Sequence, residues 1–477
     1  MISLLLILIP LFTGLLTFFL KQEKTAKNFS IFSSVITLGT IFIAIFFAQN
    51  NQLLFNTQWL PALGSRFSIS LDGMSKILVL LTAISFPVVF ISTYTNKYKN
   101  SHSFYALMLL TQAGLMGVFM ATDALLFYFF WELALIPVYF LSSIWGGEKR
   151  IAVTFKFFIY TFIGSLLMLV GILYLYFNTV VPSFQIKDLL AAKISLKEQN
   201  ILFWLFFIAF AIKMPIFPLH TWQPDAYEQS PTAVTMILSG VMVKMGLFAV
   251  LRWLVPLFPE SANAYSNIVI ALSVIGMIYA SLIAIKQDDI KRLIAYSSIA
   301  HIGLMCATIF THTVIGTTGV MLQMFNHGIN VIGLWIVADA IEQQLGTRKF
   351  SELGGLAQKA PTLAILFVIL ALANIALPLT NAFVGEFLMF NSLFQYNVWV
   401  AAIAGISIIL AAVYTLNMVQ KILYGNTVAA TEKALDTTLN INWMLIVLVV
   451  IVFVLGVYPQ PIIDLTKDTV NVIVQNR

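Results

Sequence analysis

Long apolar blocks are the feature of this sequence that most limits the folds open to it. Each block is close to the ~20 residues that a helix needs to cross a lipid bilayer. The blocks predict an all-α membrane protein with fourteen transmembrane helices. The fourteen expected spans are 2–20, 29–48, 71–95, 104–121, 123–145, 151–177, 201–221, 231–253, 265–285, 290–311, 314–342, 361–396, 398–424 and 441–458.

The composition supports this interpretation and excludes several other classes. The chain is 60% hydrophobic and 10% charged, whereas soluble domains carry about 25% charged residues. The net charge of +6 does not indicate nucleic-acid binding, because the cations lie in short loops between apolar blocks. A single cysteine, Cys306, cannot build a disulfide framework or an iron–sulfur cluster. The first block has no basic stretch before it and no small-residue cleavage site, so we expect a retained span.

The basic residues predict the topology. If the N-terminus lies on side A, fifteen Lys and Arg residues fall in loops on side B and seven on side A. The excess makes side B cytoplasmic. An even number of spans then places both termini on the opposite, periplasmic side. Composition favours a bacterial inner membrane over an organelle.

Six ionisable side chains fall deep within expected spans. An isolated charge at mid-membrane costs at least about 2.5–3.5 kcal/mol on insertion scales. We therefore expect these side chains to face one another and water, and to relay protons. A carboxylate near a desolvated lysine can switch its proton affinity, and histidine exchanges protons near neutral pH. The predicted relay is Glu132 paired with Lys213, then Lys244, His301, His327 and finally Glu386.

Other charged residues have simpler explanations. Lys76 and Lys156 lie near span ends, where a lysine can extend to the interface. Asp72 and Asp123 begin spans and are interpreted as helix N-terminal anions. Two carboxylates at the end of a span are expected to be solvated: Asp339 and Glu342.

Prolines predict two broken helices. Pro215 and Pro218 interrupt the seventh span, so the carbonyls of Ala211 and Met214 lose their usual helical partners. Pro378 likewise interrupts the twelfth span and leaves the carbonyl of Asn374 without its helical partner. In hydrocarbon, freed carbonyls are tolerated only where they line protein or a water-filled cavity.

Paired breaks in the two halves of a chain indicate a transporter built from inverted repeats. Spans 4–8 and 9–13 each contain five helices, an odd number, so the second copy is inverted. The tail after Pro459 is expected to form an amphipathic helix on the membrane surface. The predicted units are a three-helix N-terminal segment at 1–100, a first repeat at 101–255, a second repeat at 256–425, and a last helix with its tail at 426–477.

Three stretches carry a family resemblance: "FPLHTWQPDAYEQSPTAVTMILSGVMVKMGLFAVLRW", "IKRLIAYSSIAHIGLM" and "FYFFWELALIPVYFL". They resemble the antiporter-like subunits of respiratory complex I, the NADH:quinone oxidoreductase. The resemblance implies fourteen transmembrane helices, two inverted five-helix repeats and a hydrophilic axis at mid-membrane. It also implies one proton channel and no cofactor in this chain. NADH, FMN, iron–sulfur clusters and quinone are expected in other subunits.

The resemblance also assigns the site. It implies that the six residues of the predicted relay are the family's ionisable residues on helices 5, 7, 8, 10, 11 and 12. Glutamate at 386 resembles the M type (mitochondrial chain 4), since the L and N types generally carry lysine there. L-type and N-type subunits are the implied neighbours. The family usually has a glycine after the proline of the twelfth helix, where this chain has Leu379.

Other functions stay open at this point. The chain could belong to a multi-subunit sodium/proton antiporter, which Glu386 disfavours. It could be a membrane subunit of a hydrogenase or of a formate-oxidising complex. A free-standing solute carrier is disfavoured, because no polar, substrate-sized recognition set exists beyond the ionisable residues. Haem ligation by His301 and His327 is disfavoured because no second histidine pair exists.

Overall fold

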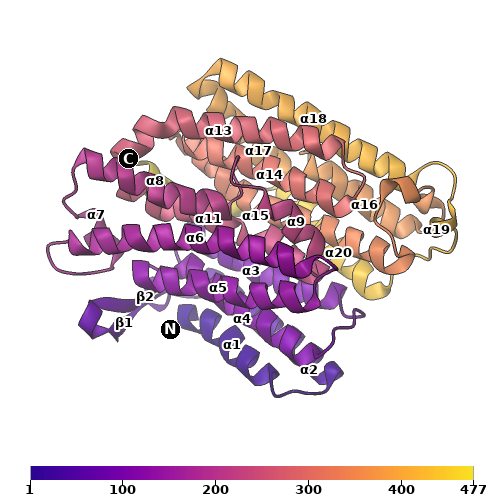
Figure 1. The fold of residues 1–477 in the computed structure, drawn as a ribbon, viewed down its shortest axis with the longest axis horizontal. Helices are drawn as coiled ribbons and strands as arrows, with labels where there is room; N and C mark the ends of the chain where they lie inside the picture. Colours follow the sequence, from indigo (N-terminus) through magenta and orange to yellow (C-terminus); the bar gives the residue numbers. More distant parts are fainter. Residues whose placement is uncertain (1, 476–477) are drawn as a thin grey trace.

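Most of the chain folds into helices that run side by side along the molecule (Figure 1). This computed structural model describes residues 2–475. In that range eleven helices are long and apolar enough to cross a membrane, and two further apolar helices are shorter, Ile2–Thr17 and Pro361–Asn374. The chain is therefore a multi-pass, mainly helical membrane protein, as its apolar blocks predict.

The helices of the first half occupy mainly the lower part of Figure 1, in indigo and magenta. Their bounds are α1 Ile2–Thr17, α2 Glu23–Phe46, α3 Gly73–Ser92, α4 Ser101–Met120, α5 Ala124–Trp145, α6 Arg150–Phe177, α7 Ile186–Leu190, α8 Leu196–Lys213, α9 Trp222–Gln229, α10 Thr232–Ile237, α11 Lys244–Ala249 and α12 Val255–Leu257. Two π-helical segments, η3 Leu238–Met242 and η4 Val250–Leu254, join α10, α11 and α12 into one continuous span.

The second half follows in orange and yellow, with α13 and α18 along the upper edge of the view (Figure 1). Its helices are α13 Pro259–Ile285, α14 Ile290–Ile309, α15 Val314–Leu345, α16 Pro361–Asn374, α17 Asn381–Tyr396, α18 Val398–Leu423, α19 Ala429–Glu432, α20 Leu439–Val457 and α21 Gln460–Gln475. Short 3₁₀ turns lie at η1 Asn50–Gln52, η2 Pro61–Leu63, η5 Phe350–Glu352 and η6 Leu356–Gln358.

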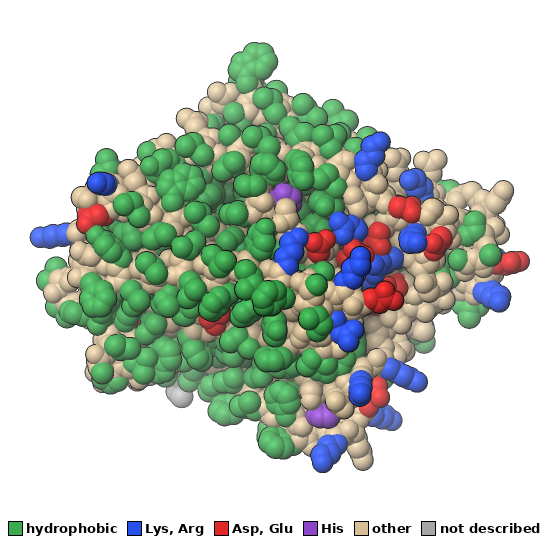
Figure 2. Space-filling view, viewed as in Figure 1, with side chains coloured by type: hydrophobic (Ala, Val, Ile, Leu, Met, Phe, Trp, Pro, Cys, Tyr) green, Lys and Arg blue, Asp and Glu red, His purple; other side chains and the backbone are tan. Residues whose placement is uncertain are grey.

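The surface separates apolar from charged side chains. Figure 2 shows hydrophobic side chains over the middle of the face, while Lys, Arg, Asp and Glu gather towards one end. Several large hydrophobic side chains stay exposed on the helices, such as Phe177 at 76% and Trp399 at 77%. Such exposure suits contact with lipid tails or with neighbouring subunits.

A β-hairpin corrects the all-α prediction. Strands β1 Leu54–Leu60 and β2 Ser65–Ser70 pair antiparallel, and Gly64 turns the chain between them at φ +66°. A lone hairpin is marginal in water. This one is held by the rest of the fold, since Ser68 Oγ lies 2.7 Å from Thr122 Oγ1. Sequence patterning missed it because the stabilising partner is more than fifty residues away.

The two expected helix breaks are confirmed. The helix before Pro215 ends at Lys213, and α9 resumes only at Trp222. The carbonyl of Ala211, freed by Pro215, accepts from Ile216 N at 2.9 Å. The twelfth expected span divides into α16 and α17 around residues 375–380.

The expected N-terminal anions are confirmed. Asp72 accepts from Ser75 N at 3.0 Å at the start of α3, and Asp123 accepts from Leu125 N and Leu126 N at the start of α5. Burial alone would raise the pKa of Asp72. The Arg252 guanidinium, 2.5 Å away, and the Ser75 N–H more than offset this and hold that pKa below its ordinary value.

The C-terminal helix α21 is amphipathic, as predicted, but its apolar face is not free to lie on lipid. Ile462, Thr466 and Val470 are buried at helical spacing. The helix packs against α3 and α15, and Thr469 Oγ1 accepts from Gly73 N at 3.0 Å. Protein therefore covers the stripe that the sequence assigned to the membrane surface.

The break between α16 and α17 carries backbone strain at Leu379. This residue has φ +73° and a side chain that is 66% exposed. A left-handed conformation costs a non-glycine residue roughly 1–2 kcal/mol. We expect Leu379→Gly to raise the free energy of unfolding by about 0.5–1 kcal/mol, after allowing for the greater unfolded-state entropy of glycine. Equilibrium unfolding of the purified chain in mixed detergent micelles measures this change in the free energy of unfolding.

Leu377→Gly is the matched control, because Leu377 is similarly placed in the break but is not in the left-handed region. That substitution should lower stability. A Leu379→Gly variant no more stable than the parent would show that the break is relaxed with leucine in place.

Candidate functional site

We refer to the six predicted relay residues as the ionisable row: Glu132, Lys213, Lys244, His301, His327 and Glu386. Lys244 is its most buried member, with 0% exposure. It begins α11 between the π-helical segments η3 and η4; such segments are frequent at functional sites. Its Nζ forms hydrogen bonds with the carbonyl oxygen of Ser239 and with Nδ1 of His327, each 2.8 Å long.

The row continues from α15 to α14 and α17. The His327 and His301 ring centroids lie 5.4 Å apart. His301 Nδ1 is 3.1 Å from Glu386 Oε1, and the same oxygen accepts from Gln323 Nε2 at 3.2 Å. Each of these histidines and Glu386 is at most 8% exposed. Four members, starting at Lys244, thus form a chain of contacts across four helices.

The other two members lie apart from that chain. Glu132 on α5 and Lys213 on α8 are close enough to interact electrostatically. In the described residues 2–475, however, the Glu132 carboxylate and Lys213 Nζ are not within the 4.0 Å that defines an ion pair. Lys213 Nζ lies 5.6 Å from the centroid of the Trp131 ring and has no hydrogen-bond partner in the protein. The expected pair is open in this conformation.

Sequence reasoning missed three amides of α15 that serve the row. Gln323, Asn326 and Asn330 follow helical spacing on one face of that helix. Asn326 Nδ2 donates to the carbonyl of Asn381 at 2.7 Å, and Asn330 Nδ2 donates to that of Ala373 at 3.2 Å. These bonds satisfy carbonyls on both sides of the α16–α17 break, as a membrane interior requires. The helical spacing of these three amides within a membrane span could have identified them from the sequence.

Several buried polar atoms of the row have no protein partner. They are Oε1 of Glu132, Nζ of Lys213 and Nε2 of both row histidines. Buried polar groups are nearly always satisfied by protein or by ordered water. The zone around the row is therefore suited to hydration, which a proton relay needs where side chains do not touch.

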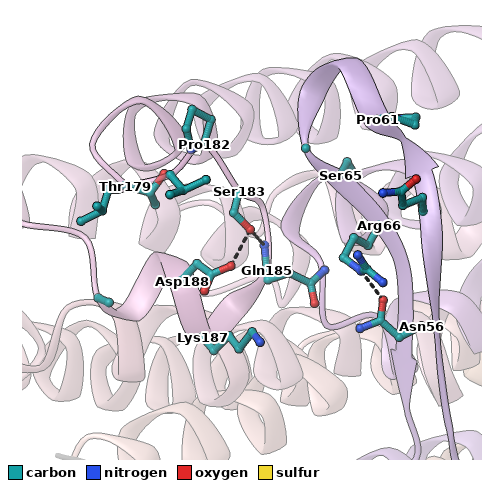
Figure 3. A pocket seen from close by; sticks show the side chains of 15 residues that line it. Asn56, Pro61, Ser65, Arg66, Thr179, Pro182, Ser183, Gln185, Lys187 and Asp188 are labelled. Carbon is teal, nitrogen blue, oxygen red and sulfur yellow. Dashed lines mark hydrogen bonds between the residues drawn. The ribbon is translucent and has the colours of Figure 1, made fainter.

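A large cavity lies elsewhere, between the β-hairpin and residues 179–191 (Figure 3). Its volume is about 640 Å³, and no member of the ionisable row lines it. In Figure 3, Arg66 reaches towards Asn56 and Ser183 towards Asp188. In the described chain, no group of three or more His, Cys, Asp and Glu side chains is arranged to hold a metal ion.

Comparison with known proteins assigns this geometry to a family. The model of the NADH:quinone oxidoreductase/Mrp antiporter transmembrane family matches residues 121–411, which contain the whole ionisable row. The chain belongs to this family. The match spans more than half of the chain and covers the motifs from which the resemblance was inferred.

Related family members share most of their length with this chain. NADH-quinone oxidoreductase subunit M of Rickettsia prowazekii is 40% identical over 88% of this chain and 87% of its own. F(420)H(2) dehydrogenase subunit M of Methanosarcina mazei is 34% identical over 98% of this chain and 97% of the length of that subunit. A chain of respiratory complex I from Thermus thermophilus with bound NADH superimposes with a TM-score of 0.92 at 28% identity, covering 100% of this chain and 99% of that one. The resemblance to complex I subunits of the M type is confirmed.

Proposed function

We propose that this chain is the M-type, proton-translocating membrane-arm subunit of an NADH:quinone oxidoreductase. The observation that carries the proposal is the contact chain from Lys244 through His327 and His301 to Glu386. A row of titratable groups buried between helices can pass a proton sideways through the membrane, with water filling the gaps. The similarity to M-type subunits supports the assignment to the complex.

The chain converts energy rather than carrying electrons. Redox chemistry takes place in other subunits, which hold the flavin, the iron–sulfur clusters and the quinone, and this chain holds no cofactor. When Glu132 approaches Lys213, the lysine cation is favoured; when they separate, its proton is released to the next group. The proton then passes along Lys244, His327 and His301 to Glu386.

The proposed architecture has fourteen transmembrane helices in two inverted five-helix repeats. The N-terminal segment spans 1–100, the repeats span 101–255 and 256–425, and the last helix with its tail spans 426–477. The broken helices α8–α9 and α16–α17, one in each repeat, support this division.

The proposed location is a bacterial inner membrane, with both termini on the periplasmic side. The excess of basic residues in the loops of side B supports this orientation. Other membrane-arm subunits are the partners, with an L-type and an N-type subunit on either side. The exposed apolar helices offer surface for these neighbours and for lipid.

Glu132→Gln tests the relay. Glutamine matches the shape of glutamate but cannot hold a charge beside Lys213, so the proton affinity of the lysine no longer switches. We expect a loss of proton pumping of at least about tenfold through this chain, with the complex still assembled. Pumping by membrane vesicles and the subunit content of the purified complex measure the two effects.

Glu148→Gln provides the control, because Glu148 is exposed in the loop before α6. It should pump like the parent. Normal pumping in Glu132→Gln would remove this pair from the mechanism.

The alternative is a subunit of a multi-subunit sodium/proton antiporter or of a membrane-bound hydrogenase. The antiporter alternative is compatible with the family description, which includes Mrp antiporters. Purification distinguishes them: co-purifying flavin and iron–sulfur subunits support the oxidoreductase, and sodium-dependent transport supports the antiporter.

A further inference from the structure

Asp339 is a buried carboxylate near the side-B end of α15. Sequence reasoning expected it to be solvated, but it is only 5% exposed. Its Oδ2 accepts from Asn96 Nδ2 at 3.1 Å, whereas Oδ1 has no hydrogen-bond partner in the protein. It lies twelve residues, or about 18 Å of helix, from His327. A carboxylate buried inside a membrane span is costly, so its presence there requires an explanation.

Asp339 lines a cavity of about 340 Å³ at the side-B end. The charged groups around the same cavity are Lys97, Lys99, Glu228, Lys291, Glu342 and Arg348. Tyr98 also faces Asp339, from the segment between α3 and α4. The cavity provides a route for water from the surface to the buried carboxylate.

The other charges of this cavity are largely engaged with each other. Lys291 Nζ is 2.6 Å from Glu342 Oε2. Arg348 bridges Glu342 at 3.1 Å and Glu228 at 2.9 Å. Asp339 forms no such ion pair in the described chain, although it interacts electrostatically with Lys291 at longer range. A carboxylate that is not locked by a cation can gain and lose a proton at lower cost.

A polar helix face leads from Asp339 towards Lys244. Thr232 lies beside Asp339, and Thr235 and Ser239 follow it at helical spacing on α10 and η3. The carbonyl of Ser239 accepts from Lys244 Nζ at 2.8 Å. Every residue from 232 to 251 is buried.

A phenol completes this route. The Tyr227 hydroxyl faces the side chains of Gln223 and Ser239. Ser239 Oγ lies 3.4 Å from Ser298 Oγ. Hydroxyl groups and the water they hold can pass protons, because each both donates and accepts.

We propose that Asp339 is the group through which this chain collects protons from the cytoplasm, and that the face of Thr232, Thr235 and Ser239 delivers them to Lys244. The inference rests on the proposed function and adds an entry site to it. A hydronium ion in the cavity gives its proton to the Asp339 carboxylate, and water is left behind. The carboxylic acid then releases the proton to the hydroxyl and water chain, which protonates the Lys244 amine and restores the carboxylate.

Asp339→Asn in the intact complex tests the proposal. Asparagine keeps an oxygen that can accept from Asn96, so the local fold is preserved. We expect pumping by membrane vesicles to fall at least about tenfold at alkaline side-B pH. In this variant, uptake depends directly on hydronium, so its rate should drop about tenfold for each unit of rising pH, unlike that of the parent. Asp339→Glu should restore most of the activity.

Lys97→Gln is the control, because it removes an exposed charge from the same cavity but not from the proposed route. It should pump within about twofold of the parent. Normal pumping in Asp339→Asn, with pumping lost in Lys244→Met, would overturn the entry site and leave the relay standing. Normal pumping in Lys244→Met would overturn the proposed function itself and this inference with it.

Discussion

Lys244→Met is expected to lower proton transfer through this chain by about 100-fold or more while the complex still assembles. Methionine fills nearly the same volume and removes the charge, so packing between α11 and its neighbours should survive. What is lost is the group that joins Ser239 to His327 through two 2.8 Å hydrogen bonds. The remaining distance between the entry side and the histidines then has no titrating group to bridge it.

The measurement is the ratio of protons pumped to electrons transferred in membrane vesicles, with native gels to verify assembly. Lys76→Met is the matched control, because Lys76 also lies within a span but is half-buried near the start of α3. Its loss should leave the ratio unchanged. An unaltered ratio in Lys244→Met would mean that protons bypass the contact chain from α11 to α17.

The membrane solvent explains why so much of this fold could be predicted. Lipid demands about twenty apolar residues for each crossing, and this demand is visible in sequence as block length. The same solvent makes a buried charge expensive, so Lys244, His301, His327 and Glu386 stood out before their contacts were known. Proline chemistry located the breaks before Trp222 and Asn381 because the missing N–H is a local property.

Features that depend on distant partners were not predictable. The β-hairpin pairs with segments beyond residue 120, and its seven-residue first strand gives no clear signal alone. The π-helical segments beside Lys244 could not be predicted from the intrinsic helix propensities of their residues. Asp339 looked like a solvated residue at a span end, because the cover provided by Asn96 and α10 comes from other parts of the chain.

The contact chain also indicates where movement is needed. Lys244, His327, His301 and Glu386 are already within reach of one another, whereas Glu132 and Lys213 are not paired. The unpaired lysine ends α8 at the helix break, where the backbone can shift with fewer hydrogen bonds to disrupt. In the proposed mechanism, closure of this pair is therefore the step most readily coupled to events in neighbouring subunits.

Asp123→Ala should be the most destabilising single change outside the ionisable row. Asp123 is 0% exposed and accepts five hydrogen bonds, which tie the start of α5 to the hairpin and to the segment before α7. The donors are Ser65 Oγ, Arg66 N, Leu125 N, Leu126 N and Gln185 Nε2, at 3.0–3.1 Å. Figure 3 shows Ser65, Arg66 and Gln185 among the residues that line the large cavity.

Alanine leaves these donors without an acceptor, and each unsatisfied buried group costs about 1–3 kcal/mol before relaxation. Because the loop can partly rehydrate, we expect a loss of about 3–5 kcal/mol in the free energy of unfolding, measured for the purified chain in mixed micelles. Asp188→Ala is the control: Asp188 lines the same cavity but is only half-buried and accepts from Ser183 Oγ, so its loss should cost about 1 kcal/mol or less. Equal losses in the two variants would show that Asp123 does not join the three segments, and that the hairpin is held by Thr122 and the helix faces instead.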